Sequence, residues 1–495
     1  MSVSRESTVT LGRGDSVNGQ GSRINRNFTH GASASYSMNS RMEEQSGNRL
    51  IIAVDFGTTY SAVSYVPILQ GQSPDLVDAS SIRSIKNYPE NRTFNSNDEM
   101  VAEVPTEVIY PLNKDFRDEE APNTMHHNIP GEDFHESTTN LVFDLDSESP
   151  SRYDLDGDVR MLGSVPEGRF RWGYQVHELW SLPSTHSDSS NQPLSRFKLL
   201  LDSSPITKSL REKVQRTVLK LQRQKIVKGN LGVIADFLTY LLKHTERELE
   251  DAGFDDSFHR EIVLCVPAIW TQQACRHMQT CMAIAMKRAE FKGVDTENNS
   301  IDNLFIVSEP EAAAAYVLID ERGLDCGDVF VLLDAGGGTV DANTYEISKT
   351  TPLRLSREIV APGGGLYGSS FLNEKFCEYL KQRLASETYL EQGTETINGI
   401  VETIMMDQFE YRMKRSFDLY TASETSKRFA VFGLRNNPSK GFDKGCIIVP
   451  AKMFLACLEG VGSIMEAQIN AAKERNYKVK VNCILGLSLC LSAHQ

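Results

Sequence analysis

The fold is decided by two stretches, Ile51-Ile-Ala-Val-Asp55-Phe-Gly57-Thr-Thr-Tyr-Ser61 and Val329-Phe-Val-Leu-Leu-Asp334-Ala-Gly336-Gly-Gly-Thr-Val-Asp341. Each reads as a buried strand, an Asp at the strand end, a glycine turn with Thr, and a second β-rich stretch, which covers 62–66 after the first turn and 342–347 after the second. A single turn of this kind could be an ordinary glycine hairpin. Two copies at matching strand ends of one chain instead favour two related loops that face one cleft.

The residue types of both turns suit a phosphate group. Their glycines let backbone N–H groups turn inward without a Cβ clash: Gly57, Gly336, Gly337 and Gly338. Their threonines add hydroxyl donors: Thr58, Thr59 and Thr339. Asp55 and Asp334 would repel phosphate, so they fit a Mg²⁺ ion that lies between them and the phosphates and is held through its waters. No Walker A motif occurs, and a strand rather than a helix follows each turn, which excludes the Rossmann fingerprint.

Both turns resemble the phosphate 1 and phosphate 2 motifs of the actin-like ATPase fold, and they are most similar to those of the 70-kilodalton heat-shock chaperones. Residues 307–316, 262–270 and 196–202 are similar to three further segments of these chaperones, and 105–108 and 171–176 resemble their divergent member-12-like branch. The resemblance covers about residues 49–485. It implies an α/β fold with two lobes, built as ribonuclease H-like duplicated domains, and a nucleotide cleft between the lobes.

The resemblance also implies roles for individual residues. Asp55 and Asp334 would orient the water shell of Mg²⁺ and the attacking water, and Thr339 would close on the γ-phosphate. Lys198 would neutralise charge on the transferring group, and Glu309 would position the water. Such positioning and charge stabilisation is most of what phosphoryl transfer needs. The implied contacts to ATP or ADP through the phosphates are Gly57, Thr58, Thr59, Tyr60, Gly336, Gly337, Gly338 and Asp341.

Two further segments resemble the part of the family's site that holds adenosine. The glycine-rich loop at 363–373 precedes an expected helix and implies that Gly364, Gly365 and Gly368 lie near the ribose and phosphates. Residues 409–417 resemble the helix that touches the adenine, with Lys414 and Arg415 as the contacts. The Glu spacing in this helix is off by one relative to the main chaperones.

Several of these residues also have a purely structural interpretation. Lys198 could be the end of a buried helix that reaches out to water, and Glu309 before Pro310 could simply begin a helix. Asp341 could be a turn or cap residue, and Lys414 with Arg415 could be a basic pair on an exposed helix. The alanines at 312–315 are expected to let a helix pack closely.

Composition bounds the class of protein. With 495 residues, 40% of them hydrophobic, the chain exceeds the size of a single core, so at least two lobes are expected. The net charge of −14 argues against nucleic acid as a partner. Nine cysteines without metal-ligand spacing are typical of reduced thiols in a cytoplasmic or nuclear protein. No targeting segment and no apolar run of membrane-spanning length is found, so no membrane partner is expected.

The expected domain order follows from these motifs. Residues 1–48 are predicted to be a disordered tail because they are rich in Ser, Asn, Gly and Arg. The first lobe should span 49–325, with 113–160 as an acidic insertion or loop. The second lobe should span 326–495. Within the lobes we expect helices from residue 231 and over 452–474, and strands at 262 and over 481–485, in an alternating α/β order.

The C-terminal region departs from the family. After the strand at 481–485 the family has a glycine loop under the adenosine, whereas this chain continues with the apolar residues 484–495 and retains only Gly486. We therefore expect a second lobe that is truncated at its adenosine-binding end. No region is left for a peptide-binding domain, so peptide holding in the usual manner is not expected.

Three functions remain open at this point. The first is an ATP-binding protein that slowly hydrolyses ATP with Mg²⁺ and signals by lobe closure to a co-chaperone or signalling protein. The second is a degenerate relative that acts as a binding or scaffold protein without hydrolysis. The third is a small-molecule kinase of the same superfold, which would need a base in a polar pocket. Fold analogy alone does not separate them.

Overall fold

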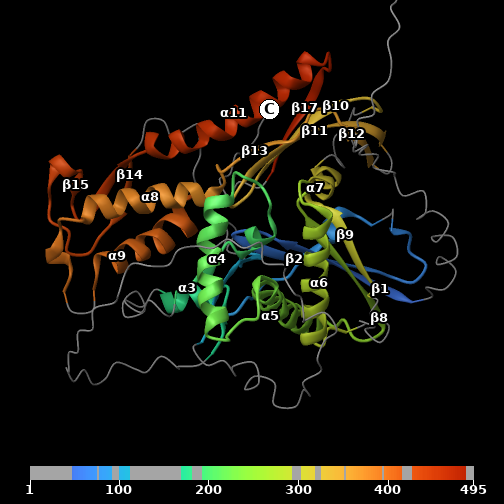
Figure 1. Cartoon of the computed structure of the whole chain (residues 1–495), viewed down its shortest axis with the longest axis horizontal. Helices are drawn as coiled ribbons and strands as arrows, with labels where there is room; N and C mark the ends of the chain where they lie inside the picture. The colour runs from blue at the N-terminus through green and yellow to red at the C-terminus, as the bar shows by residue number, and fades with distance from the viewer. Residues whose placement is uncertain are drawn as a thin grey trace, which may run out of the picture. The chain divides into compact units, whose positions relative to one another are not determined.

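Both decisive stretches form the predicted strand, turn and strand, and each lies in its own sheet (Figure 1). A computed structural model describes residues 47–74, 77–91, 100–111, 169–180, 192–292, 301, 303–317, 325–350, 353–392, 395–414 and 426–485. The predicted tail and the insertion at 113–160 lie outside these residues, except that the first strand already begins at Asn48. The described residues belong to one unit, 47–495, of mixed α/β structure.

The first sheet holds Asp55. Its strand order is β3-β2-β1-β8-β9, and β4 pairs with the turn end of β2. β1 runs antiparallel to β2 and parallel to β8. The bounds are β1 (Asn48–Phe56), β2 (Tyr60–Ile68), β3 (Arg83–Ser84), β4 (Glu103–Pro105), β8 (Phe258–Val266) and β9 (Leu304–Ser308).

The second sheet holds Asp334 and repeats this pattern. Its order is β12-β11-β10-β17, and β13 pairs with the turn end of β11. β10 runs antiparallel to β11 and parallel to β17, as β1 does to its two neighbours. The bounds are β10 (Val329–Ala335), β11 (Val340–Thr350), β12 (Leu353–Glu358), β13 (Gly363–Gly365) and β17 (Val479–Leu485).

Two small sheets of three described strands complete the β structure. One has the order β6-β5-β7, with β5 (Glu107–Ile109), β6 (Arg171–Trp172) and β7 (Leu194–Ser195). The other has the order β14-β16-β15, with β14 (Ser426–Ala430), β15 (Phe442–Asp443) and β16 (Cys446–Pro450).

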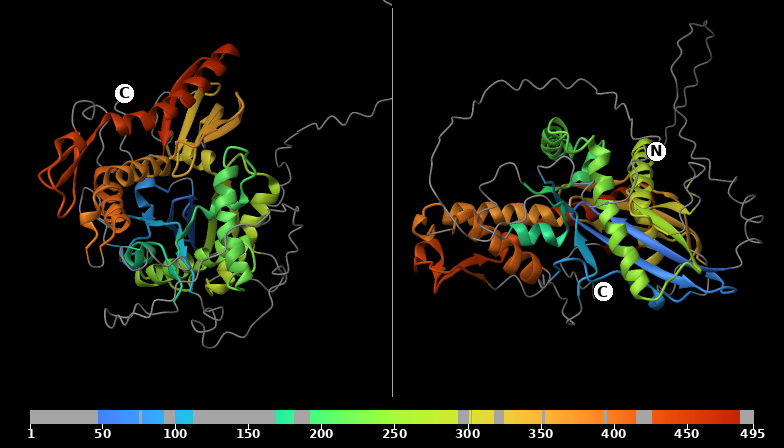
Figure 2. Two further views of the ribbon diagram at one scale, coloured as in Figure 1. Left: turned by 60° about the vertical axis from the view of Figure 1, so that its left-hand side comes forward. Right: turned by 90° about the horizontal axis from the view of Figure 1, so that it is seen from below.

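Helices cover the sheets with apolar faces. The α-helices are α3 (Tyr174–Trp180), α4 (Lys208–Arg223), α5 (Asn230–Asp251), α6 (Gln272–Arg288), α7 (Glu309–Val317), α8 (Ser369–Leu384), α9 (Ile397–Thr403) and α11 (Lys452–Glu474). Short 3₁₀ helices are η2 (Ala79–Ser81), η4 (Phe197–Leu201), η5 (Thr388–Leu390) and η8 (Pro438–Lys440), and η6 (Ile404–Met413) is a π-helix. In the views of Figures 1 and 2, α11 lies along the strands of the second sheet.

Apolar alternation explains the large core of the first sheet. Leu50, Ile52 and Val54 of β1 are fully buried, and they pack with residues of α5 and α6 in one cluster. The predicted helix from residue 231 is α5, and its continuous apolar side supplies much of this cluster. In the part of the chain that the structure describes, no helix is long and apolar enough to cross a bilayer.

Helix α7 packs between the two large sheets. It contacts β8 and β9 of the first sheet and β10 of the second. Ala313 and Ala314 pack against Phe330 and Leu332 of β10, so the expected close packing by small residues is confirmed. This places Glu309, the first residue of α7, near both predicted turns.

Candidate functional site

The first turn follows β1 and requires glycine. Asp55 lies at the end of β1 and is opposite Ala62 of β2 and Cys265 of β8 in the strand registers. A Cβ atom on Gly57 would lie 2.0 Å from the carbonyl oxygen of Tyr60, so no other residue fits this bend without movement.

The second turn repeats this geometry and is held by α8. Asp334 at the end of β10 is opposite Asp341 of β11. The hydroxyl of Thr339 donates to Asp341 at 2.8 Å. The amides of Ser369 and Ser370, the first residues of α8, donate to the carbonyls of the turn glycines 336 and 337 at 3.0 and 2.8 Å.

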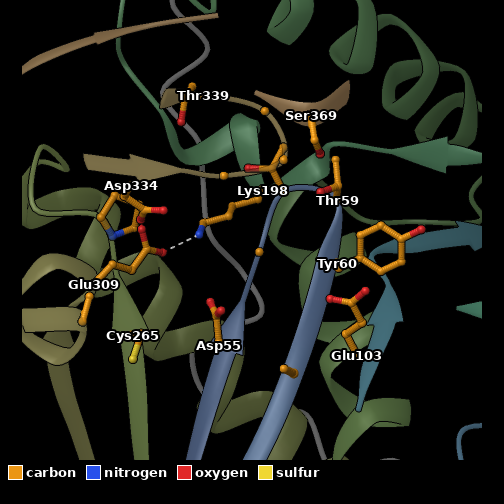
Figure 3. A pocket seen from close by; sticks show the side chains of 18 of the residues that line it. Asp55, Thr59, Tyr60, Glu103, Lys198, Cys265, Glu309, Asp334, Thr339 and Ser369 are labelled. Carbon is orange, nitrogen blue, oxygen red and sulfur yellow. Dashed lines mark hydrogen bonds and ion pairs between the residues drawn. The ribbon is translucent and has the colours of Figure 1, made fainter. Parts of the chain in front are cut away.

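The two turns touch each other. A Cβ atom on Gly337 would lie 1.6 Å from Oγ1 of Thr59, and one on Gly338 would lie 2.9 Å from Cγ2 of Thr58. Glycine in the second turn thus makes room for the threonines of the first. The predicted meeting of both turns at one place is present in the structure, with direct contact between them (Figure 3).

A cavity of about 990 Å³ opens beside this contact. Asp55, Lys198, Glu309 and Asp334 are directed into it from β1, η4, α7 and β10 (Figure 3). All five residues predicted as catalytic line the cavity, together with the predicted phosphate contacts of both turns: Asp55, Gly57, Thr58, Thr59, Tyr60, Lys198, Glu309, Asp334, Gly336, Gly337, Gly338, Thr339 and Asp341.

Lys198 and Glu309 form an ion pair across the cavity. Lys198 is the second residue of η4, and its Nζ donates to Oε1 of Glu309 at 2.7 Å. The amine also lies 5.6 Å from the ring centre of Trp270 and 6.0 Å from that of Phe56, within cation–π range. The alternative of a lysine that reaches out to water from a buried helix is wrong, because the side chain is 7% exposed and ends in this pair.

Carboxylates outnumber cations around the cavity. Asp55 faces the cavity, but the protein around it removes much of its contact with water. This desolvation, followed by the charge of Glu309, raises the pKa of Asp55 to about 6. Burial, followed by the charges of Glu309 and Asp341, raises the pKa of Asp334 to about 7. Burial also raises the pKa of Asp341. For Lys198, burial opposes the charged form, but Glu309 and Asp55 outweigh it and raise the pKa of its amine.

A second cavity of about 260 Å³ also borders the first turn. Both cavities share Thr58, Thr59, Tyr60 and Ser369 as walls, and the smaller one also contains the predicted adenine contact Lys414. Nζ of Lys414 lies 2.8 Å from the carboxylate of Glu410, in an ion pair that is almost fully buried. Lys414 is therefore a buried partner of Glu410, not the exposed basic residue of the structural alternative.

Glu410 joins three segments of the chain at this second cavity. It accepts hydrogen bonds from Lys414, from the hydroxyl of Tyr60 at 3.2 Å and from Asn373 of α8 at 2.7 Å. It lies in the π-helix η6, whose wider turn carries about one residue more than an α-helical turn. The sequence comparison found that the position of Glu in this segment differs by one residue from that in the main chaperones. This difference falls within the wider helix η6.

The remaining predicted residues have other places. Gly364 and Gly365 pair with Asp341 and Val340 as part of β13 and line neither cavity. Gly368 precedes α8, and a Cβ there would lie 2.6 Å from the carbonyl oxygen of Gly337, so it packs directly against the second turn. Arg415 and Gly486 lie outside the described residues.

Several lining residues were not singled out from the sequence: Lys86, Glu103, Asp202, Cys265, Trp270 and Ser369. Asp202, Cys265 and Trp270 lie in the segments 196–202 and 262–270, which resemble segments of the chaperones. The sequence therefore pointed to these segments, but not to these three residues as part of the site. Glu103 lies in the three-residue strand β4, and no local pattern marks it. Burial, followed by the charges of Asp55 and Glu309, raises the pKa of the Cys265 thiol to about 12, so it stays protonated at neutral pH.

The donor set fits a phosphate chain with Mg²⁺. Mg²⁺ prefers oxygen ligands and keeps several waters, and the crowded carboxylates of Asp55 and Asp334 would gain from a cation. Glycine amides and threonine hydroxyls of the two turns suit phosphate oxygens. Among the described residues, no group of three or more His, Cys, Asp or Glu side chains is arranged for direct metal coordination. A metal bound through water stays a prediction.

Comparison with known proteins gives two distant relatives. No family model matches the chain. It is 24% identical to the human heat shock 70 kDa protein 12A over 283 residues and 25% identical to the mouse protein of that name. Each alignment covers 46% of this chain and 39% of the relative. The chain thus spans about two fifths of the length of the relatives it matches. The match supports a distant Hsp70-like relationship.

Proposed function

We propose that this protein binds ATP with Mg²⁺ between its two glycine turns and hydrolyses it slowly, as an actin-like ATPase of the heat-shock type. The repeated arrangement of the two large sheets supports the two-lobed, duplicated fold that this function requires. The distant similarity to heat shock 70 kDa protein 12A points to the same nucleotide chemistry. Cytoplasmic localisation and a co-chaperone or signalling partner belong to the same proposal.

One observation carries the proposal: the two turns meet beside a cavity that also contains the partly buried pair of Lys198 and Glu309. The turns come from strands 279 positions apart in sequence, counted from Asp55 to Asp334. An ordinary glycine hairpin has no reason to face another across a polar cavity. The hairpin alternative is therefore disfavoured for both turns.

The chain's own residues suggest a division of labour. The turn amides and the hydroxyls of Thr58 and Thr59 would orient the phosphate chain. The amine of Lys198, held 2.7 Å from Glu309, would stabilise negative charge on the transferred group. Glu309 would accept a hydrogen bond from the attacking water. Bound Mg²⁺ would supply charge neutralisation at the phosphate oxygens, next to Asp55 and Asp334.

The test is calorimetric titration of ATP into the full chain with and without Mg²⁺, alongside the variant Asp334→Asn. We expect binding that requires Mg²⁺ and weakens at least tenfold in the variant. Trp270 lines the cavity, so quenching of its fluorescence should follow the same titration. Asp325→Asn is the matched control, because Asp325 is highly exposed and precedes the same strand. Failure to bind at millimolar ATP would reject the proposal.

A non-hydrolysing scaffold is the second candidate, and two observations favour it. Thr59 fills the space in front of Gly337, and Lys414 is already neutralised by Glu410. A nucleotide would need the turns to separate and this pair to rearrange. Measured phosphate release decides between the candidates: ATP binding without release above that of a Lys198→Ala variant would favour the scaffold. The kinase alternative gains no supporting observation.

A further inference from the structure

Helix α4 carries a strongly basic face on an acidic protein. Residues 206–228 contain eight Lys and Arg and one Glu, a net charge of +7 in a chain of −14. Val214, Val218 and Leu221 bury one side of the helix. Lys213, Arg216, Lys220 and Arg223 follow at helical spacing and are all exposed, so they form one stripe on the outer side.

The charges of this stripe are not neutralised by the described residues. With both partners described, the one ion pair on α4 joins Lys208 to Glu212 at 3.8 Å and involves none of the four stripe residues, although Glu212 lies one turn before Arg216 on the same face. Leu219, which is 39% exposed, lies among the basic side chains. Basic side chains around an apolar residue suit a partner that alternates acidic and apolar residues.

The chain itself contains such a partner. Residues 112–168 hold fourteen Asp and Glu against four Lys and Arg, a net charge of −10. They alternate acidic and apolar residues in Phe143-Asp144-Leu145-Asp146 and in Tyr153-Asp154-Leu155-Asp156. Every other segment outside the described residues has a net charge between −2 and +1. Charge complementarity therefore selects this one segment.

The two ends of the segment lie close to α4. The described chain stops at residue 111, just after β5, and resumes at 169, just before β6, and these strands pair with each other. β5 also pairs with β7, and β7 packs against α4. Fifty-seven residues can extend roughly 3.3 Å each, whereas α4 is about 24 Å long, so reach does not limit contact.

We propose that the basic face of α4 is an intramolecular docking surface for the acidic segment 112–168. A tethered partner acts at an effective concentration in the millimolar range, so several weak exposed ion pairs suffice to hold it. The docked segment would cover a surface that otherwise attracts polyanions. It would lie beside η4, which packs against α4 and carries Lys198.

The test is zero-length carbodiimide crosslinking of the full chain at low micromolar concentration, with the crosslinks mapped by mass spectrometry. We expect amide links from Lys213, Lys220 or Lys225 to carboxylates of 112–168, independent of protein concentration. Links should fall at least fivefold in 1 M salt, where the screening length is about 3 Å. The triple change Lys213→Glu, Lys220→Glu and Lys225→Glu should also expose 112–168 to proteases.

A matched control separates this effect from a general change in charge. Lys452→Glu, Lys473→Glu and Lys478→Glu change the net charge equally at exposed positions of and after α11, and should leave protease sensitivity of 112–168 unchanged. Circular dichroism must show that both triple variants are folded. Links that appear only at high concentration would show a second copy on α4 and overturn the proposal. Tight binding of DNA or anionic vesicles by the parent chain at physiological salt would overturn it too.

Discussion

Asp334 has a pKa of about 7 because it is buried near three other carboxylates. Its folded-state pKa lies above the ordinary value of 3.8, so the folded chain binds this proton more tightly than the unfolded chain. The group therefore contributes stability that is complete below about pH 4 and is lost as the pH rises through 7. At pH 8 its charge opposes folding unless a cation or ligand compensates it.

The variant Asp334→Asn should consequently be more stable than the parent when no nucleotide is present. We expect the apparent Tm to rise by roughly 2 °C or more at pH 8 and by less at pH 5.5, where the parent carboxyl is protonated. Differential scanning calorimetry at both pH values measures this. An equal or lower Tm of the variant at pH 8 would contradict the assigned charge environment.

Lys198 and Glu309 should be strongly coupled. Lys198→Met leaves the carboxylates of Asp55 and Glu309 without their cation, and breaking this partly buried pair should cost up to about 3 kcal/mol of unfolding free energy. The added change Glu309→Gln should recover part of this loss. Denaturant unfolding of the two single variants and the double variant gives the coupling energy. Additive effects would show that the pair in η4 and α7 contributes little.

At the scale of elements, the contact of the two turns predicts a specific rescue. Gly337→Ala places a Cβ atom 1.6 Å from Oγ1 of Thr59, so the turns must separate, and we expect a loss of about 2 kcal/mol or more. Thr59→Gly removes the opposing side chain and should restore most of the loss in the double variant. Thermal unfolding checks this. No rescue would mean that the turns do not touch in solution.

Two glycines of α11 should respond in opposite directions to alanine. A Cβ on Gly460 would lie 2.4 Å from the ring of Tyr367, whereas Gly462 has open space around it. Gly462→Ala should stabilise the protein by about 0.5–1 kcal/mol because alanine favours a helix. Gly460→Ala should destabilise it. Opposite shifts of Tm in the same helix support the packing of α11 against Tyr367, and equal shifts contradict it.

Sequence patterns found those elements whose signal is local. The two hairpins, α5 and α11 follow from apolar periodicity, and the predicted bounds 452–474 agree with those of α11. The 3₁₀ helix η4 and the π-helix η6 were not foreseen, because five or ten residues carry no periodicity that separates them from α-helix. The pair of Lys414 with Glu410 and the contact to Tyr60 depend on such elements.

The residues of the two glycine turns could be predicted from the sequence, whereas several other residues that line the cavity could not. Asp55 and Asp334 follow directly from strand ends with glycine turns. Glu103 enters the cavity from β4 only because this strand pairs with β2, a long-range contact that the sequence does not state. Gly368, which is expected near the ribose and phosphates, lies against the second turn, where the close backbone approach requires glycine; its place at a nucleotide stays a prediction.

At the scale of the whole molecule, ATP should protect both turns together. If one ligand binds both, hydrogen exchange at 57–60 and at 336–339 should slow in the same titration and with the same midpoint. Stabilisation at a hundredfold excess over Kd would reach about 2.7 kcal/mol. Native-state exchange read by mass spectrometry is the measurement. Protection of one turn alone would place the ligand in a single half of the chain.

The hydrogen bonds to Glu410 can form only at different times during synthesis of the chain. Lys414 is four residues from Glu410 and can pair with it at once, but Tyr60 precedes Glu410 by 350 positions. At about 5–20 residues per second, the first hairpin waits roughly 20 to 70 s on the ribosome before its partner exists. β1 likewise waits for β8, since Arg49 and Glu261 are 212 positions apart. During translation the residues that line the cavities therefore come together in several steps. The contact between Tyr60, which lines both cavities, and Glu410 is among the last to form.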